Sequence, residues 1–356
     1  MHTIPRGKAI GLLYLFLSPL APAFAQNPQP PPAPSGAVTA PGTVTPAGFV
    51  PAPILQGGEV FLLYPPGSPF LKQDRVNEPE QHNMTSGVPG RIQSIVNIHN
   101  PSIELHRVER GTNTGAAVIL IAGGGHNTLN VGTEGADFVS YFYQYGVTTI
   151  ILRSRLRRDG YNAQTDEVYD AQQAVRMVRA RAQEWGIDAN KIGLMGFSAG
   201  AELVAPAAVF YEKFDQANSA PADPLRAVRS RPDFAVLIYP GPTPFARDPN
   251  TAIPRDAPPS FIASAGTGDA IHAQWADEYF SAFLKARIPN LEMHLYGNGV
   301  HGNGLKDRDG TPFGTWPNRF VDWFRDLGFL GKPGVETKAA KDVKIRVAAP
   351  APTPRP

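Results

Sequence analysis

The sequence of 356 residues contains no cysteine. This absence excludes disulfide bridges and a thiolate nucleophile, and it leaves only histidine and carboxylate side chains as ligands for a zinc site. Any nucleophile in the chain is therefore a hydroxyl, a carboxylate or an amine. The lack of cysteine is also compatible with an oxidising environment such as the periplasm or the cell exterior.

An excess of charge of one sign is absent as well. The sequence has 33 Lys and Arg against 31 Asp and Glu, a formal net charge of +2, which gives no electrostatic basis for binding nucleic acid. Hydrophobic residues make up 42% of the chain and charged residues 18%, which is enough for one large core without a second domain. We therefore expect one globular domain and no nucleic-acid partner.

The apolar stretch near the N-terminus, Ile10 to Leu20, is shorter than the about 20 residues that cross a bilayer. Arg6 and Lys8 precede it, and Ala23-Phe24-Ala25 follows as a small-x-small cleavage site. This pattern predicts a signal peptide over residues 1–25, with an uncleaved anchor as the alternative. After cleavage the chain is expected in the periplasm or outside the cell, without membrane association.

Two segments of biased composition lie on either side of the expected domain. Residues 26–54 contain nine prolines and almost no charge, which predicts a disordered linker. Residues 333–356 alternate Lys with Ala and end in APAPTPRP, which predicts a disordered tail. The globular domain is therefore expected to occupy residues 55–332.

Within the domain, short apolar runs alternate with helical patterns. Runs of this kind are typical of strands that are covered on both faces, and they occupy residues 116–122, 147–152, 192–197, 234–239, 260–265 and 291–296. Helical spacing is found at residues 134–145, 165–185, 201–214 and 273–287. The alternation predicts an α/β fold, with a mostly parallel central sheet and helices on both faces. Two earlier strand-like segments, residues 92–98 and 103–108, are predicted to pair antiparallel at one edge.

One serine lies between two glycines where a predicted strand ends and a predicted helix begins, in Gly196-Phe197-Ser198-Ala199-Gly200. In an open α/β sheet, ligands bind at the carboxyl ends of the strands. The two glycines remove side chains that would collide across a sharp turn, so that the Ser198 hydroxyl projects at the N-terminus of the helix. Ser198 is thus a candidate nucleophile, and an ordinary glycine-containing turn is the alternative.

A serine hydroxyl needs a base to take its proton and a third group to orient that base. Asp269 follows the strand-like run over residues 260–265, in Gly-Thr-Gly-Asp, and His301 follows the run over residues 291–296, in a glycine-rich loop. Both positions are expected at strand carboxyl ends, in the chain order Ser, Asp, His. Taken singly, Asp269 would be a turn aspartate and His301 a solvated loop histidine. Their joint placement with Ser198 favours a catalytic triad.

Attack on a carbonyl also places negative charge on oxygen, which hydrogen-bond donors must stabilise. Gly123, Gly124 and Gly125 follow a predicted strand and can turn their N–H groups towards the serine. With the N–H of Ala199 they are the candidate oxyanion donors. Glycine triplets also bind phosphate, but no Lys-Ser or Lys-Thr follows this one, and no acidic residue completes a dinucleotide pattern.

The segments AGGGH, GFSAG, GTGD and GVHG, in this order and at these separations, resemble the α/β-hydrolase fold serine esterases. The resemblance is strongest to the branch with acetyl xylan esterases, feruloyl-acetyl esterases and hormone-sensitive-lipase-like carboxylesterases, and it runs from about Gln93 to Leu330. It implies an α/β-hydrolase domain at residues 55–332, with Ser198 as nucleophile, Asp269 as orienting acid and His301 as base. The glycine triplet would then supply oxyanion donors.

The glycine loop departs from the family pattern at one position. Many relatives have histidine before the triplet, where this sequence has Ala122, and His126 follows the triplet instead. Which pair of glycines donates is therefore left open. His126 is a candidate for contact with the substrate, with a solvated loop residue as the alternative.

Proteins of this branch are often named xylanases. Glycoside hydrolysis requires two opposed carboxylates about 5–10 Å apart, and the sequence marks no such pair. We therefore do not expect this chemistry from the chain.

The other histidines and the tryptophans have weaker signals. His272 lies three residues after Asp269 and is an alternative base, although we expect it to open the following helix. Because no H-x-x-x-H spacing occurs, we predict no metal ion, and the proposed chemistry needs no cofactor. Trp316 is the one tryptophan that stays a candidate for contact with substrate, with helix packing as the alternative, whereas Trp275 and Trp323 are assigned to helix packing.

These observations predict an exported serine esterase that acts on a small-molecule or polysaccharide ester, with acetyl or feruloyl groups on plant polysaccharide as the expected substrate. A general carboxylesterase or lipase for small acyl esters is one alternative. A catalytically silent carbohydrate-binding protein of the same fold is another.

Overall fold

The computed structural model describes residues 1, 41–109, 111–217, 223–302, 304–305 and 310–350. Apart from Met1, these residues belong to one compact unit that extends from Pro32 to Pro356. The other unit, Met1–Pro31, includes the predicted signal peptide, and all of it except Met1 lies outside the described residues. In the part of the chain that is described, no helix has both the length and the apolar character needed to cross a membrane.

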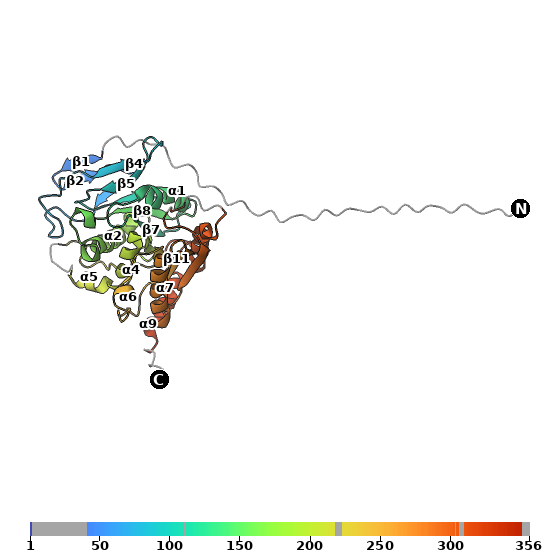
Figure 1. Cartoon of the computed structure of the whole chain (residues 1–356). Helices are drawn as coiled ribbons and strands as arrows, with labels where there is room; N and C mark the ends of the chain where they lie inside the picture. Colours follow the sequence, from blue (N-terminus) through green and yellow to red (C-terminus); the bar gives the residue numbers. More distant parts are fainter. Residues whose placement is uncertain (2–40, 110, 218–222, 303, 306–309, 351–356) are drawn as a thin grey trace. The chain divides into compact units, whose positions relative to one another are not determined.

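Within the described residues, an eight-stranded sheet forms the core of the larger unit, in the order β12-β11-β10-β9-β7-β8-β6-β3. Figure 1 labels its strands β7, β8 and β11. The six strands from β12 to β8 run parallel to their neighbours, while β6 and β3 pair antiparallel. The strands are β3 (Glu59–Leu62), β6 (Ser102–His106), β7 (Ala117–Ile121), β8 (Thr148–Arg153), β9 (Ile192–Phe197), β10 (Ala235–Ile238), β11 (Ser260–Thr267) and β12 (Glu292–Asn298). The predicted α/β fold with a mostly parallel sheet is confirmed.

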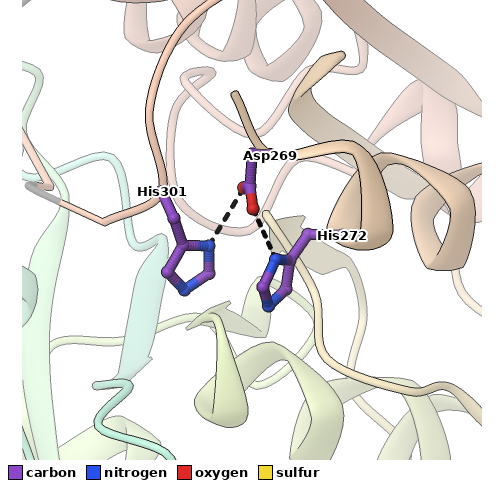
Figure 2. Close-up of side chains that lie close together, drawn as sticks. All are labelled: Asp269, His272 and His301. Carbon is purple, nitrogen blue, oxygen red and sulfur yellow. Dashed lines mark hydrogen bonds and ion pairs between the residues drawn. The ribbon is translucent and has the colours of Figure 1, made fainter. Parts of the chain in front are cut away.

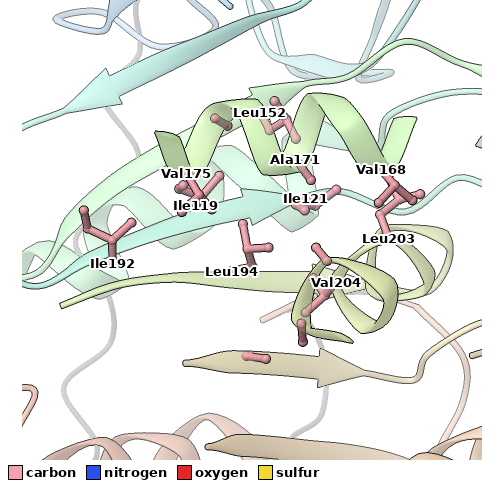
Figure 3. Close-up of a cluster of buried hydrophobic side chains, with 14 of the residues drawn as sticks. Ile119, Ile121, Leu152, Val168, Ala171, Val175, Ile192, Leu194, Leu203 and Val204 are labelled. Atoms are coloured by element: carbon pink, nitrogen blue, oxygen red, sulfur yellow. The ribbon is translucent and has the colours of Figure 1, made fainter. Parts of the chain in front are cut away.

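Alternation along β7 divides the core between the two faces of the sheet. Ile119 and Ile121 pack in one cluster with side chains of α2 (Val168–Ala180), α4 (Ala199–Val209) and α7 (Ala270–Lys285), part of which is drawn in Figure 3. Val118 and Leu120 pack in the opposite cluster, with α1 (Asp137–Tyr143) and α8 (Trp316–Asp326). Because both faces are covered, the strand is apolar throughout, as its sequence predicted.

Shorter helical segments connect these elements. They are η1 (Gly132–Ala136), η2 (Arg157–Asp159), η3 (Ala163–Glu167), α3 (Ala182–Trp185), α5 (Tyr211–Ala217), α6 (Pro244–Arg247) and η4 (Pro312–Thr315). The segments η1 and η3 are π-helical turns that lead into α1 and α2, so the predicted helices over residues 134–145 and 165–185 each begin with a wider turn.

The predicted antiparallel pairing of residues 92–98 with residues 103–108 is wrong. β5 (Ile92–Val96) pairs with β4 (Gln81–Met84) in a separate two-stranded sheet, whereas β6 pairs with β3 and β8. Asn97, which follows β5, has a φ of 62° and turns the chain away from a hairpin. The partner strands β3 and β4 are short and partly polar, which is why their sequences gave no strand signal.

Part of the predicted linker and part of the predicted tail are ordered, so the expectation of disorder is wrong there. β1 (Gly42–Thr45) and β2 (Gly48–Pro51) form a hairpin whose Phe49 is buried, with its N–H donating to the Val76 carbonyl at 2.7 Å. α9 (Lys338–Ala348) begins at a Thr337 side-chain cap and buries Ala339. Burial of Phe49 and of Ala339 therefore orders segments whose composition predicted disorder. Residues 26–40 and 351–356 lie outside the described residues.

Candidate active site

Ser198 lies at the junction between β9 and α4, in a backbone conformation with φ 53° and ψ −120°. A non-glycine residue rarely has a positive φ, and the strain must be compensated by the surrounding structure. Two hydrogen bonds hold this turn: the Ser198 N–H donates to the Ile238 carbonyl at 3.0 Å, and the Gly241 N–H donates to the Ser198 carbonyl at 3.1 Å. The turn therefore sits at the carboxyl ends of β9 and β10 and holds the serine at the edge of the sheet.

The two glycines around Ser198 are required by close backbone contacts. A Cβ atom on Gly196 would lie 2.4 Å from the Gly200 carbonyl oxygen, and one on Gly200 would lie 2.0 Å from the Ile121 carbonyl oxygen. Both distances are far below van der Waals contact. The sharp turn predicted from Gly-x-Ser-x-Gly is thus explained by the approach of α4 to β9 and β7.

The structure brings Ser198, Asp269 and His301 together. His301 Nε2 lies 2.8 Å from Ser198 Oγ, and His301 Nδ1 lies 3.0 Å from Asp269 Oδ2. Asp269 follows β11 and is only 6% exposed, whereas His301 follows β12 and is exposed. A carboxylate bonded to Nδ1 fixes the tautomer in which Nε2 is free to accept a proton from the serine.

Asp269 is the centre of a small network of imidazoles (Figure 2). Its second oxygen, Oδ1, accepts a hydrogen bond from His272 Nδ1 at 2.5 Å. Burial raises the pKa of the Asp269 carboxyl, but the hydrogen bonds from His272 and His301 outweigh burial and hold the pKa below its ordinary value. Asp269 is therefore ionised at neutral pH.

From the sequence, His272 is an alternative base and is predicted to open the helix after Asp269. It lies in the first turn of α7, as predicted. In the structure its Nδ1 is bonded to Asp269, and the hydroxyl of Ser198 is bonded to His301. The ligand atoms of Asp269, His272 and His301 lie within 4.8 Å of one another, a spacing that could hold a metal ion. The hydrogen bonds to Asp269 account for the same arrangement without one.

The glycine loop passes directly beside the serine, since a Cβ on Gly123 would lie 2.9 Å from Ser198 Cβ. The N–H of Gly123 donates to Glu134 Oε2 at 2.7 Å, so Gly123 is not available as an oxyanion donor, contrary to the sequence prediction. No hydrogen bond from the N–H of Gly124, Gly125 or Ala199 occurs within the described residues. These three groups remain the candidate donors.

Glu134 is a site residue that the sequence analysis missed. Its carboxylate is 2% exposed and joins the glycine loop to the end of β10, because Oε1 accepts a hydrogen bond from the Tyr239 hydroxyl at 2.8 Å. The ring of Tyr239 in turn packs edge-on against His301, with centroids 4.9 Å apart. In the sequence, Glu134 has the position of an ordinary acidic residue in the first turn of a helix, which gives no sign of this role.

His126 is buried rather than solvated, with 5% exposure. Its Nδ1 lies 2.6 Å from Glu167 Oε2 and its Nε2 lies 3.0 Å from Glu202 Oε2. Burial alone would lower the pKa of His126, but the hydrogen bonds to the two carboxylates outweigh it and raise the pKa to about 9. His126 is thus a cation at neutral pH, held between two glutamates.

A cavity of about 350 Å³ opens beside Ser198. Seven of the twelve described residues that line it have polar or charged side chains, and the full set is Gly125, His126, Arg157, Gln164, Ser198, Ala199, Glu202, Gly241, Pro242, Arg247, His272 and Trp275. His126 therefore borders the space next to the serine, which agrees with its interpretation as a candidate for substrate contact and not as a solvated loop residue. Arg247 and Gln164 both donate to Glu202 Oε1, which fixes the glutamate on the cavity wall.

The predicted contact between Trp316 and substrate is wrong. Trp316 is completely buried and packs against Phe138 and Phe197, in the core between α1, α8 and the sheet. Trp275, which the sequence analysis assigned to helix packing, lines the cavity, with its ring edge-on to His272 at 5.2 Å. Position along the chain did not distinguish the two, because each tryptophan lies near a loop of the site.

The chain is similar to known proteins over part of its length. Residues 103–247 match the family model described as BD-FAE. An acetylxylan esterase from Xylanibacter ruminicola is 26% identical over 262 residues, which cover 66% of this chain and 48% of the relative. An endo-1,4-beta-xylanase B from Butyrivibrio fibrisolvens is 29% identical over 124 residues, 35% of this chain and 19% of the relative. The chain therefore matches about half or less of the length of these relatives.

Solved structures show the same fold. An acetyl ester-xyloside bifunctional hydrolase from Caldicellulosiruptor lactoaceticus has a TM-score of 0.55 and 24% identity, with 65% of this chain and 90% of that chain covered. Esterase 2 from Thermogutta terrifontis, phosphorylated by paraoxon, has a TM-score of 0.58 and 19% identity, with 78% and 96% covered. The chain has the α/β-hydrolase fold, and the resemblance to its esterases is confirmed.

Proposed function

We propose that this protein is a serine esterase in which Ser198 is the nucleophile, His301 the general base and Asp269 the residue that orients it. The observation that supports this most directly is the pair of hydrogen bonds on the two nitrogens of His301, at 2.8 Å to Ser198 Oγ and at 3.0 Å to Asp269 Oδ2. This arrangement, on the turn between β9 and α4, is suited to acyl transfer.

In the proposed reaction, His301 Nε2 takes the proton from Ser198 as Oγ bonds to the ester carbonyl carbon. The carbonyl oxygen becomes an oxyanion, for which the N–H groups of Ala199, Gly124 and Gly125 are the candidate donors. The C–O bond to the alcohol then breaks, and His301 returns the proton to the leaving oxygen. Water attacks the acyl-enzyme with the same proton transfers and releases the acid and free Ser198. This sequence of steps uses no cofactor or metal ion.

We further propose a short acyl group, with an acetyl ester on a plant polysaccharide as the substrate. Seven of the twelve described residues that line the cavity beside Ser198 have charged or hydrogen-bonding side chains, and Trp275 and Pro242 are its two large apolar residues. A long acyl chain would have only these two large apolar side chains to pack against. The similarity to an acetylxylan esterase supports the same choice, and a feruloyl ester is the alternative that the cavity lining disfavours.

The similarity to a xylanase does not extend the proposal to glycoside hydrolysis. Two opposed carboxylates are needed for that reaction. Among the described residues that line the cavity, Glu202 is the one carboxylate, and it is held by His126, Gln164 and Arg247. Export through the predicted signal peptide remains part of the proposal, since it would bring the enzyme to its polysaccharide.

The proposal is tested by acetate release from acetylated xylan and by hydrolysis of p-nitrophenyl acetate and p-nitrophenyl octanoate. We expect turnover of the two acetyl esters, a lower kcat/KM for the octanoate, and loss of all activity in Ser198→Ala. A fluorophosphonate probe should label Ser198, which mass spectrometry of the labelled peptide can verify. A folded wild-type chain that neither labels nor turns over would favour a silent binding protein, and a fully active Ser198→Ala would point to another nucleophile.

A further inference from the structure

His272 shares the carboxylate of Asp269 with His301. His272 Nδ1 lies 2.5 Å from Oδ1, and His301 Nδ1 lies 3.0 Å from Oδ2, so each oxygen accepts one imidazole N–H. The carboxylate is ionised and accepts only, which makes both Nδ1 atoms donors. With one donor on each oxygen, the Asp269 side chain cannot rotate without breaking a charge-assisted hydrogen bond.

The ring of His272 also stacks on the ring of His301. Their centroids are 3.9 Å apart with an interplanar angle of 27°, and in Figure 2 both rings lie on the same side of the carboxylate, with the remaining nitrogens directed away from it. Tyr239 contacts His301 at 4.9 Å and 64°. His301 is therefore packed between an imidazole and a phenol ring.

His301 is an exposed residue in the segment that follows β12. The Nε2 atom nevertheless lies at hydrogen-bond distance, 2.8 Å, from Ser198 Oγ. The rings of His272, in α7, and of Tyr239, after β10, contact His301 and help to hold it at this distance.

We propose that His272 is a positioning residue for acyl transfer, which holds Asp269 through its Nδ1–H and holds the His301 ring through stacking. The expected effect on kcat rests on the proposed esterase function, whereas the expected hydrogen bonding and stacking do not. Orientation of a base is worth a large factor in rate, since a misplacement of about 1 Å can cost about 100-fold. His272 acts through Asp269 and His301, and its Nδ1 is already occupied by Asp269.

Two substitutions separate the hydrogen bond from the bulk of the side chain. His272→Asn keeps an N–H donor near the position of Nδ1, whereas His272→Leu fills a similar volume without a donor or a flat ring. With p-nitrophenyl acetate, we expect His272→Leu to lower kcat about 10- to 100-fold with KM changed less than about twofold. The kcat of His272→Asn should be at least about fivefold higher than that of His272→Leu. His294→Leu, on β12 and bonded to Glu292, is the matched control and should keep the wild-type kcat.

Proton NMR provides a readout that does not require turnover. The N–H between His301 and Asp269 should give a downfield resonance in the wild type and in His272→Asn, and the resonance should be lost or exchange-broadened in His272→Leu. Circular dichroism and thermal unfolding verify that each variant is folded. A folded His272→Leu with wild-type kcat and an unchanged resonance overturns the inference, and an equal loss of kcat in both variants overturns the role of the Nδ1–H donor. An inactive wild type that shows the expected resonance pattern rejects the esterase proposal alone.

Discussion

The N–H of Gly123 donates to the carboxylate of Glu134 at 2.7 Å, and the other oxygen of that carboxylate accepts a hydrogen bond from Tyr239 at 2.8 Å. One buried glutamate thus joins the glycine loop beside Ser198 to the residue that packs on His301. The candidate donors and the candidate base are positioned by the same side chain. Since Gly123 is committed to Glu134, the loop can offer an oxyanion only the N–H groups that follow.

Replacing Glu134 by Ala should therefore affect both stability and rate. Two buried donors would lose their acceptor, and each unsatisfied buried group costs about 1–3 kcal/mol. We expect the free energy of unfolding to fall by about 2–4 kcal/mol and kcat to fall about 10- to 100-fold, as the loop shifts. Urea unfolding and p-nitrophenyl acetate kinetics measure the two effects. Tyr239→Phe is the matched control, because it keeps the hydrogen bond between Gly123 and Glu134. If Tyr239→Phe lowers kcat as much as Glu134→Ala does, the loss of rate does not come from a shift of the glycine loop.

Gly200→Ala should disrupt the fold of the site. The added Cβ would lie 2.0 Å from the Ile121 carbonyl oxygen, and neither α4 nor β7 can move without opening the core. We expect destabilisation of about 3 kcal/mol or more, measured by urea unfolding, with loss of probe labelling at Ser198. Gly57→Ala is the control, since its φ is 83° and no atom lies within 4 Å of the new Cβ. Its cost should be about 1 kcal/mol, and similar costs for both variants would contradict the close contact.

The parts of the site that the sequence predicted depend on local signals. Strands covered on both faces are apolar throughout, and glycines mark sharp turns, so the positions of Ser198, Asp269 and His301 at strand ends follow from patterns of a few residues. Their meeting then follows from the parallel order of the strands, because carboxyl ends share one edge of the sheet. The structure places the three side chains in the expected relation.

The missed parts depend on which distant side chains meet. Glu134, Glu167 and Glu202 are single acidic residues in helical segments, and a solvated glutamate would have the same pattern in the sequence. Only the fold shows that Glu202 is hydrogen-bonded to His126 in the cavity wall. The predictions from composition failed for a related reason, since Phe49 and Ala339 anchor segments whose average composition indicated disorder.

Trp275 and Trp316 should respond differently to substitution. Trp275 lines the cavity beside Ser198, so Trp275→Ala should raise KM for acetylated xylo-oligosaccharides about 5- to 20-fold, by loss of a stacking face for the sugar. Trp316 is fully buried, so Trp316→Phe should lower the free energy of unfolding by about 1–3 kcal/mol and leave KM unchanged. Initial-rate kinetics and urea unfolding of both variants provide the comparison. A larger KM effect at Trp316 would restore the original sequence assignment.

The ion cluster around His126 predicts a defined pH dependence of stability. The pKa of His126 is raised to about 9 in the folded chain, above its unfolded value of about 6.5. The contribution of charged His126 to the free energy of unfolding is therefore fully present below pH 6.5, declines as the pH rises and is lost above about pH 9. Burial raises the pKa of Glu167, although the hydrogen bond from His126 opposes this effect. The net contribution of the cluster to the free energy of unfolding is therefore smaller than the pKa shift of His126 alone implies.

We expect His126→Gln to be less stable than the wild type by on the order of 2 kcal/mol at pH 6, and we expect this difference in the free energy of unfolding to narrow towards pH 9.5. Thermal unfolding of both proteins across this range measures the gap, and His106→Gln, bonded to Glu104 on β6, is the control for a histidine–carboxylate pair outside the cavity. A gap that is constant with pH would show that His126 is not charged in the folded protein.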